Sequence, residues 1–285
     1  MRYFQKGWNF SQDGPGHRLV YHLQGCNLHC PWCANPEGMD PAGTLLVNPE
    51  LLEDAFCPRG AIRARTLDRT ACAGCASRDC TTTRRNQAIA FSARDVSADD
   101  IVREAAASKS LFHDGGGVTF TGGEPTLQFD ELRDTLRALR EAGIPAAIET
   151  NGTHPRLPDL FPWIGTLMID FKHPDSQRHR NVLGMGNETV IANLREAARR
   201  HPDVLARIPC VPGFNDAPED MNALADILAA LRVNGNPRVE LLRYHEYGKI
   251  KWSRCGLNWR MPPAGPPADP PRGIFEQQGL TVVRT

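Results

Sequence analysis

Strand-like and helix-like segments alternate between residues 97 and 244, and this alternation constrains the fold more than any other feature. Short runs rich in β-branched residues are followed by longer segments whose apolar residues recur at helical spacing. We expect strands at 18–23, 117–121, 146–150, 167–171, 205–211 and 238–244, and helices at 101–107, 129–142, 188–200 and 219–231. Ser97 is expected to cap the first helix. This order predicts an α/β fold with a parallel sheet, in which the loops after the strands meet at one mouth.

Composition excludes several classes of function. Among 285 residues, 33 Lys and Arg balance 33 Asp and Glu. Because no long block has one sign, we expect no nucleic-acid groove and no anionic membrane surface. The chain has no apolar run of about twenty residues and no leader-like segment after Met1, so we expect a cytoplasmic protein. Its length suits one domain with a sizeable insertion.

Seven of the nine cysteines fall into two groups, and without an export signal such groups are typical of metal ligands rather than disulfides. Cys26, Cys30 and Cys33 directly follow the strand at 18–23. A [4Fe-4S] cluster that only carries electrons takes four thiolates, so three would leave one iron open to a small molecule. The residues alone also allow a zinc site completed by His29 or a distant residue, or plain core cysteines.

A second motif, Gly122-Gly123-Glu124-Pro125, follows the strand at 117–121. Its two glycines would let the backbone approach a ligand closely. Together with the cysteine spacing, this motif resembles the radical SAM superfamily. The resemblance implies a partial (β/α)6 barrel whose open iron binds S-adenosylmethionine (SAM). It also implies reductive cleavage of SAM to a 5'-deoxyadenosyl radical that takes hydrogen from a substrate C–H. We expect Glu124 to orient the SAM ammonium group.

The sequence is also similar to a narrower family, the glycyl-radical-enzyme activating proteins that include pyruvate formate-lyase activase. The similarity rests on residues 13–18, 24–26, 32–37, 149–152, 168–172, 207, 211–213 and 244–249. It implies that Asp170, Lys172, Arg207 and His245 line the SAM pocket, and that Glu149, Thr150, Met168 and Asp170 hold a monovalent cation. Without the resemblance, Asp170 and Lys172 would be an ordinary charge pair at the end of a strand.

The second cysteine group lies in an irregular stretch, residues 34–95, that has only short apolar runs. Cys57, Cys72, Cys75 and Cys80 could complete an auxiliary [4Fe-4S] cluster or a structural zinc site. The activating proteins that the chain resembles carry eight cysteines here, so this chain has half of their set. We expect an auxiliary iron-sulfur cluster that transfers electrons. The predicted regions are 1–33 with the SAM-cluster loop, 34–95 with the auxiliary cluster, 96–250 with the rest of the barrel, and 251–285 with a lid and a last strand.

Two cysteines remain outside these groups. Alternation along its strand predicts that Cys210 faces the helices as a small apolar residue. Cys255 follows the His245 segment, which we expect to fold over the barrel mouth. A late cysteine and one auxiliary cluster are similar to those of the radical SAM epimerases of aminoglycoside biosynthesis, such as neomycin C epimerase. We therefore expect an isomerase of antibiotic biosynthesis, with Cys255 returning hydrogen to the substrate radical.

Under this interpretation the partner is a small amino sugar or aminoglycoside, and Glu246, Glu149 and Asp216 are candidate carboxylates for its cationic groups. A flavodoxin- or ferredoxin-type protein would supply electrons. The alternative is an activase, an oxidoreductase that generates a glycyl radical on a partner enzyme. A protein that only carries electrons is not expected, because it would have no use for an open iron.

Overall fold

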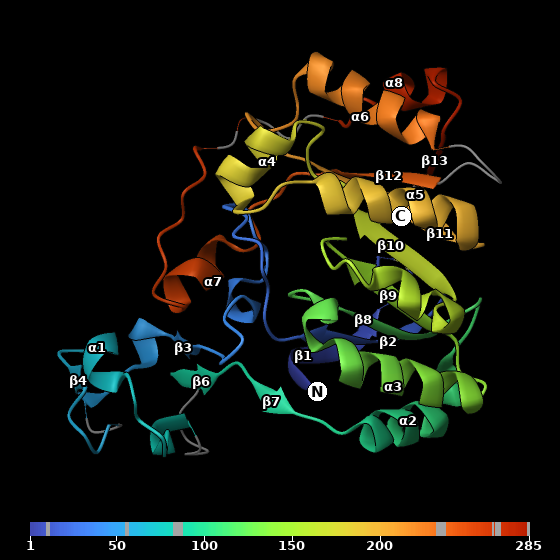
Figure 1. Ribbon diagram of the computed structural model, residues 1–285. Helices are drawn as coiled ribbons and strands as arrows, with labels where there is room; N and C mark the ends of the chain where they lie inside the picture. The colour runs from blue at the N-terminus through green and yellow to red at the C-terminus, as the bar shows by residue number, and fades with distance from the viewer. Residues whose placement is uncertain are drawn as a thin grey trace.

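The computed structural model describes residues 1–9, 12–54, 57–81, 88–231, 238–263, 265 and 269–283. Its main feature is a nine-stranded sheet in the order β13-β12-β11-β10-β9-β8-β2-β1-β7 (Figure 1). These strands are β1 (Arg2–Asn9), β2 (Arg18–Leu23), β7 (Arg94–Asp95), β8 (Gly117–Gly122), β9 (Ala146–Thr150), β10 (Thr166–Asp170), β11 (Val204–Cys210), β12 (Arg238–Arg243) and β13 (Thr281–Val283).

The six predicted strands form the parallel centre of this sheet, from β2 through β8, β9, β10 and β11 to β12. Strand β13 extends it in parallel, whereas β1 joins β2 in antiparallel orientation. The carboxyl ends of the central strands therefore lie at one edge of the sheet. The predicted α/β fold with a parallel sheet is confirmed, and it is consistent with a radical SAM partial barrel.

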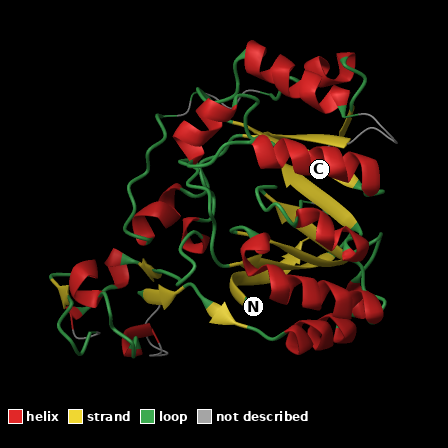
Figure 2. Ribbon diagram, in the orientation of Figure 1, coloured by secondary structure: helices red, strands yellow, loops and turns green. Residues whose placement is uncertain are grey.

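Helices cover the outer face of the sheet (Figure 2). Helices α2 (Ala98–Ala107), α3 (Phe129–Glu141), α5 (Glu188–Arg200) and α6 (Pro218–Ala230) match the four predicted ones. The Ser97 hydroxyl accepts the N–H of Asp100 at 3.1 Å, as expected for a cap. Helix α3 buries Leu132, Leu136 and Leu139 against the sheet, at the spacing of one helical face. No helix in the described ranges is both long and apolar enough to cross a membrane.

Several elements were not predicted. The strand expected to be the first, β2, is the second, because β1 precedes it and pairs with it from Tyr3 to Asn9. Half of β1 is exposed and only Phe4 is buried, so its apolar residues show little alternation. Helix α4 (Ser176–Leu183) buries only His179 and Leu183, and it has no apolar stripe by which to recognise it. The short helices α7 (Lys249–Arg254) and α8 (Arg272–Gln277) were also missed.

The described residues between 45 and 91 form a small module beside the barrel, at the left of Figure 1, whereas Arg94–Asp95 of the predicted region 34–95 form β7 of the main sheet. The module contains two small sheets, β3 (Leu45–Val47) with β6 (Ile89–Phe91) and β4 (Ile62–Arg63) with β5 (Thr66–Leu67), and the one-turn helix α1 (Arg69–Cys72). Its buried apolar residues are Val47, Leu52, Ile62, Ala88 and Ile89, and Cys57 and Cys80 pack against them. So small a core leaves much of the stabilisation to other interactions.

Candidate active site at the carboxyl ends of the strands

A cavity of about 1230 Å³ opens at the carboxyl ends of the central strands. Its wall includes Thr121 and Gly122 from β8, Glu149 from β9, and Arg207 from β11, together with the 241–247 segment that continues from β12. Of the predicted SAM-pocket residues, Gly122, Glu149, Arg207 and His245 therefore share this cavity. Ligands of parallel α/β sheets bind at this edge, so the cavity is the candidate active site.

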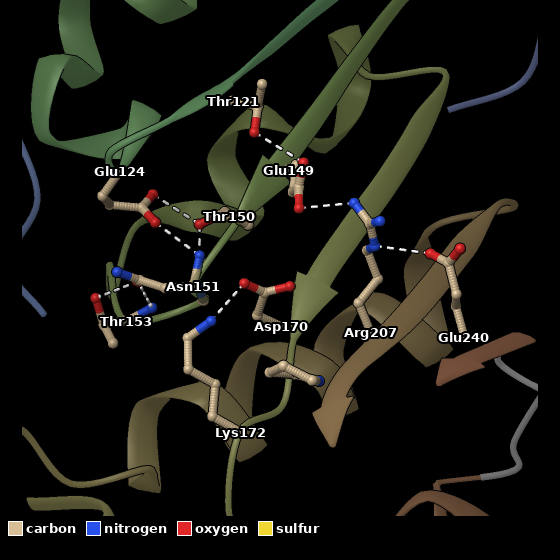
Figure 3. Close-up of polar contacts among 12 residues, drawn as sticks. Thr121, Glu124, Glu149, Thr150, Asn151, Thr153, Asp170, Lys172, Arg207 and Glu240 are labelled. Atoms are coloured by element: carbon tan, nitrogen blue, oxygen red, sulfur yellow. Dashed lines mark hydrogen bonds and ion pairs between the residues drawn. The ribbon is translucent and has the colours of Figure 1, made fainter. Parts of the chain in front are cut away.

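Arg207 connects two buried carboxylates across three strands (Figure 3). Its Nη1 lies 2.6 Å from Oε1 of Glu149, and its Nε lies 2.7 Å from Oε2 of Glu240. Burial would lower the pKa of Arg207, but the two carboxylates raise it above its ordinary value. Burial raises the pKa of Glu149 to about 7, although Arg207 opposes this effect. The positive charge is thus held firmly at the cavity wall.

Glu240 was missed by the sequence analysis. The side chain is 2 % exposed, and Glu240 lies opposite Arg207 in the β11–β12 register. The sequence does indicate a special role for Glu240, because this charged residue stands between the apolar residues Val239 and Leu241 in a buried strand. A buried carboxylate in such a position needs a cationic partner.

Lys172 and Asp170 form a second ion pair, with Nζ 2.5 Å from Oδ2. Burial alone would lower the pKa of Lys172, but Asp170 and then Cys30 and Cys26 raise it. The ammonium group therefore lies between Asp170 and the first cysteine group. The other carboxylate oxygen, Oδ1 of Asp170, is buried and has no hydrogen-bond partner in the described part of the chain. Such an oxygen can accept an external cation or an N–H group.

The glycine motif packs directly on the cysteine loop. Gly122 has a φ of +111°, and a Cβ on Gly123 would lie 2.1 Å from the carbonyl oxygen of Gly25. The N–H groups of Gly123 and Glu124 donate to the carbonyls of Leu23 and Gly25, at 2.9 and 2.7 Å. Glycine is therefore required here by the close approach of two backbones.

Glu124 is held by donors of the chain itself. It is fully buried, and its carboxylate accepts the N–H and hydroxyl of Thr126 at 3.0 and 2.5 Å. It also accepts the hydroxyl of Thr150 and the N–H of Asn151, both at 2.7 Å (Figure 3). These bonds join the glycine motif to the end of β9, and the role of Glu124 toward the SAM ammonium stays a prediction.

The three predicted cluster cysteines lie in one loop after β2, and Cys26 and Cys30 pack against an apolar group that includes Leu28 and Phe214. Burial, and then the neighbouring Cys30, raise the pKa of Cys26 to about 12. The N–H of Asn35 donates to Sγ of Cys33 at 3.4 Å. Buried thiolates need a metal or a cation beside them, and a backbone N–H to sulfur is a usual feature of iron-sulfur ligands. The loop therefore fits a cluster.

All four cysteines of the second group line one small cavity in the module. The N–H of Ala61 donates to Sγ of Cys57 at 3.3 Å, and a backbone hydrogen bond from Arg78 lowers the pKa of Cys75. The donor set is thus four thiols, at least two of which receive N–H groups, as iron-sulfur ligands do. Within the described residues, no three His, Cys, Asp or Glu side chains are arranged to hold a single metal ion.

The two remaining cysteines lie away from the cavity wall. Cys210 packs against the main core, where it was expected. Cys255 is 4 % exposed at the end of α7, and its charged neighbours are Glu37, Arg69 and Lys251. It is not one of the residues that line the cavity, whereas His245 and Glu246 are. Asp216, a candidate for binding a cationic sugar, instead accepts the N–H of Gly213 at 2.8 Å.

Known relatives of the chain are named as activating enzymes. It is 30 % identical to the indoleacetate decarboxylase activating enzyme of Tractidigestivibacter scatoligenes, over 91 % of this chain and 88 % of that protein. It is 32 % identical to the isethionate sulfite-lyase activating enzyme of Desulfovibrio desulfuricans, over 86 % and 83 %.

These relatives overturn the predicted epimerase. Relatives that align with nearly the whole chain are named for the activation of other enzymes. The prediction of an amino-sugar isomerase and of a small-molecule partner was therefore wrong. The proposed role of Cys255 as hydrogen donor falls with it, because that role belonged to the epimerase mechanism.

A family model described as the radical SAM superfamily matches residues 20–225. The fold is also similar to that of Streptococcus suis SuiB bound to precursor peptide SuiA, with a TM-score of 0.51, 18 % identity, and coverage of 81 % of this chain and 40 % of that one. Family membership implies a [4Fe-4S] cluster and SAM. The match covers most of the barrel and the cysteine loop, and the chain belongs to the radical SAM superfamily.

Proposed function

We propose that the chain is an activating enzyme that generates a glycyl radical on a partner enzyme. The observation that carries this proposal is the similarity to activating enzymes over nearly the whole chain. The cavity supports it, because about 1230 Å³ exceeds the roughly 300–1000 Å³ of sites for drug-sized ligands. SAM and an inserted segment of a protein could share such a space.

Cys26, Cys30 and Cys33 would hold the [4Fe-4S] cluster of the active site. When bound, the cluster and SAM supply one electron and a 5'-deoxyadenosyl radical that can take hydrogen from a glycine Cα. The chain must then hold that glycine close and keep other hydrogen donors out. The support for such a position is that the cysteines of the loop are half-buried near Leu28 and Phe214 and that the loop contacts the glycine motif.

Two charged side chains, Arg207 on the cavity wall and Lys172 beside the first cysteine group, would bind the polar ends of SAM. The guanidinium of Arg207 and the ammonium of Lys172 are fixed by their ion pairs, so they would meet a carboxylate without reorganisation. His245 lies on the cavity wall, stacked on Tyr247 with ring centroids 4.3 Å apart. The backbone of Gly122 and Gly123 would lie against the ligand.

A monovalent cation would bind beside this group. The residues proposed for it are Glu149, Thr150, Met168 and Asp170, and the support is the buried Oδ1 of Asp170. Hard cations of this kind prefer oxygen ligands. Thr150 and Glu149 already bond to Glu124 and to Thr121, so they would have to share their oxygens.

The second cysteine group would hold an auxiliary [4Fe-4S] cluster. Cys57, Cys72, Cys75 and Cys80 supply the four thiols that such a cluster takes. They lie where the activating proteins that the chain resembles carry their eight cysteines, and this position supports iron-sulfur rather than zinc. With four protein ligands such a cluster has no open iron, so it would transfer electrons and not bind SAM.

The test is anaerobic incubation of reconstituted protein with SAM, dithionite and purified glycyl radical enzymes. Suitable partners are the classes for which the relatives are named, an indoleacetate decarboxylase and an isethionate sulfite-lyase. We expect an electron paramagnetic resonance signal of a glycyl radical on one of them, and no signal with Cys30→Ser protein. SAM cleavage without a radical on any such enzyme would contradict the proposal.

A further inference from the structure

The segment that leaves β12 exposes apolar side chains beside the mouth of the cavity. Tyr247 is 78 % exposed, Ile250 60 % and Leu257 41 %, although all three are large apolar or aromatic residues. They lie on and around α7, within eleven residues of the chain. Such a group on one surface is typical of a site of protein–protein contact.

The same side chains line a hollow of about 660 Å³ together with Trp259. Glu246 and Tyr247 belong both to this hollow and to the wall of the main cavity. The hollow therefore adjoins the cavity, so a protein chain that occupies both would run across Glu246 and Tyr247.

Trp259 supports this surface from beside α7. Its ring packs edge-on against Trp252 of α7, with centroids 5.8 Å apart, and it lines the hollow. The hollow therefore has an aromatic wall that is fixed to α7.

The inner side of α7 fixes this surface to the cluster loop. The indole N–H of Trp252 donates to the carbonyl of Cys33 at 2.9 Å, and Nζ of Lys251 contacts Asn35 and Glu37 at 2.8 Å. A Cβ on Gly248 would lie 2.3 Å from the same carbonyl of Cys33. The outer surface is thus held in a defined position relative to the site of radical formation, as a preformed binding surface requires.

We infer that Tyr247, Ile250, Leu257 and Trp259, here called the α7 face, form the docking site for the partner enzyme. The occupant is a segment of that enzyme next to the glycine loop that enters the cavity. It would place apolar side chains on Ile250 and Leu257, the exposed apolar residues of this face. This inference rests on the proposed function, and it adds the surface by which the partner is recognised.

The test uses the reconstituted full chain with the glycyl radical enzyme that wild-type protein activates. The double variant Ile250→Glu/Leu257→Glu places two charges on the α7 face and should weaken binding to that enzyme at least about tenfold. At low partner concentration, the rate of radical installation should fall by the same factor as the affinity for the partner. Iron content and partner-free SAM cleavage should remain unchanged, because neither side chain lines the main cavity. The matched control is Leu111→Glu, since Leu111 is 45 % exposed on a turn at the opposite edge of the sheet.

A second variant, Ile250→Ala, removes only the exposed apolar side chain and adds no charge. It should weaken partner binding by about two- to tenfold. Normal binding and activation by the double variant, with wild-type protein active, would overturn the docking site and leave the proposed function intact. If wild-type protein installs no radical on any partner, the proposed function fails and the docking site with it.

Discussion

The barrel and the cysteine module are stabilised in different ways. The barrel has a continuous core that includes Phe120, Ile148 and Ile169, each completely buried between strands and helices. The module has a few buried residues around Leu52 and Ile62, against which two of its cysteines pack. The barrel can fold on apolar burial alone, whereas the module depends on what its cysteines bind. Loss of a metal should therefore affect the two regions differently.

The largest expected effect is a loss of activity when the first cysteine group, in the loop after β2, is changed. Cys30→Ser removes one of three thiols of the first cysteine group, so SAM cleavage should fall below detection, while the barrel remains folded. Measurement of 5'-deoxyadenosine and of the circular dichroism spectrum checks both statements. Cys210→Ala is the matched control and should cleave SAM normally, because Cys210 packs against the core. Cleavage by the Cys30 variant would refute the assignment of the site.

Arg207→Leu should produce the largest loss of barrel stability. The guanidinium is 6 % exposed between Glu149 and Glu240, so its removal takes the cationic partner from two buried carboxylates. Denaturant unfolding should show a loss of about 3–5 kcal/mol, and SAM affinity should fall as well. Arg238→Leu breaks the half-exposed pair with Asp203 and should cost less than about 1 kcal/mol. Equal losses for the two variants would disprove the central role of Arg207.

Cys72→Ser should affect the module and spare the barrel. Iron should fall from about eight to about four per chain, since one of two four-iron clusters is lost. Limited proteolysis should then cut within residues 34–95, because the small core no longer suffices. An unchanged iron content in the variant, or one zinc in place of four irons in the wild-type protein, would exclude the auxiliary cluster.

The smallest expected effect is the pH dependence of the stability of the barrel. Burial raises the pKa of Glu149 to about 7 from its ordinary 4.5, so the folded state binds more protons than the unfolded state between these values. The free energy of unfolding should therefore fall as pH rises from 4.5 to 7, by on the order of 2–3 kcal/mol. Glu149→Gln should remove this part of the pH dependence. An identical pH profile in the variant would contradict the raised pKa.

The sequence predicted the barrel better than the site. Strand and helix periodicity located β2, β8, β9, β10, β11 and β12, because each element carries its own apolar pattern. The contacts of Glu124 with Thr150 and of Arg207 with Glu240 join separate strands, and one strand's pattern contains no information on its neighbour's register. Cys255 was misplaced for the same reason, since its environment is made by Arg69 and Glu37 from distant parts of the chain.

The most direct test of the account is hydrogen transfer from the partner enzyme. A glycyl radical enzyme labelled with α-deuterated glycine is incubated with reconstituted protein, SAM and reductant, and the 5'-deoxyadenosine is analysed by mass spectrometry. The account predicts one deuterium in 5'-deoxyadenosine, in step with the growth of the glycyl radical signal. Unlabelled 5'-deoxyadenosine formed at the same rate with and without the partner would contradict it.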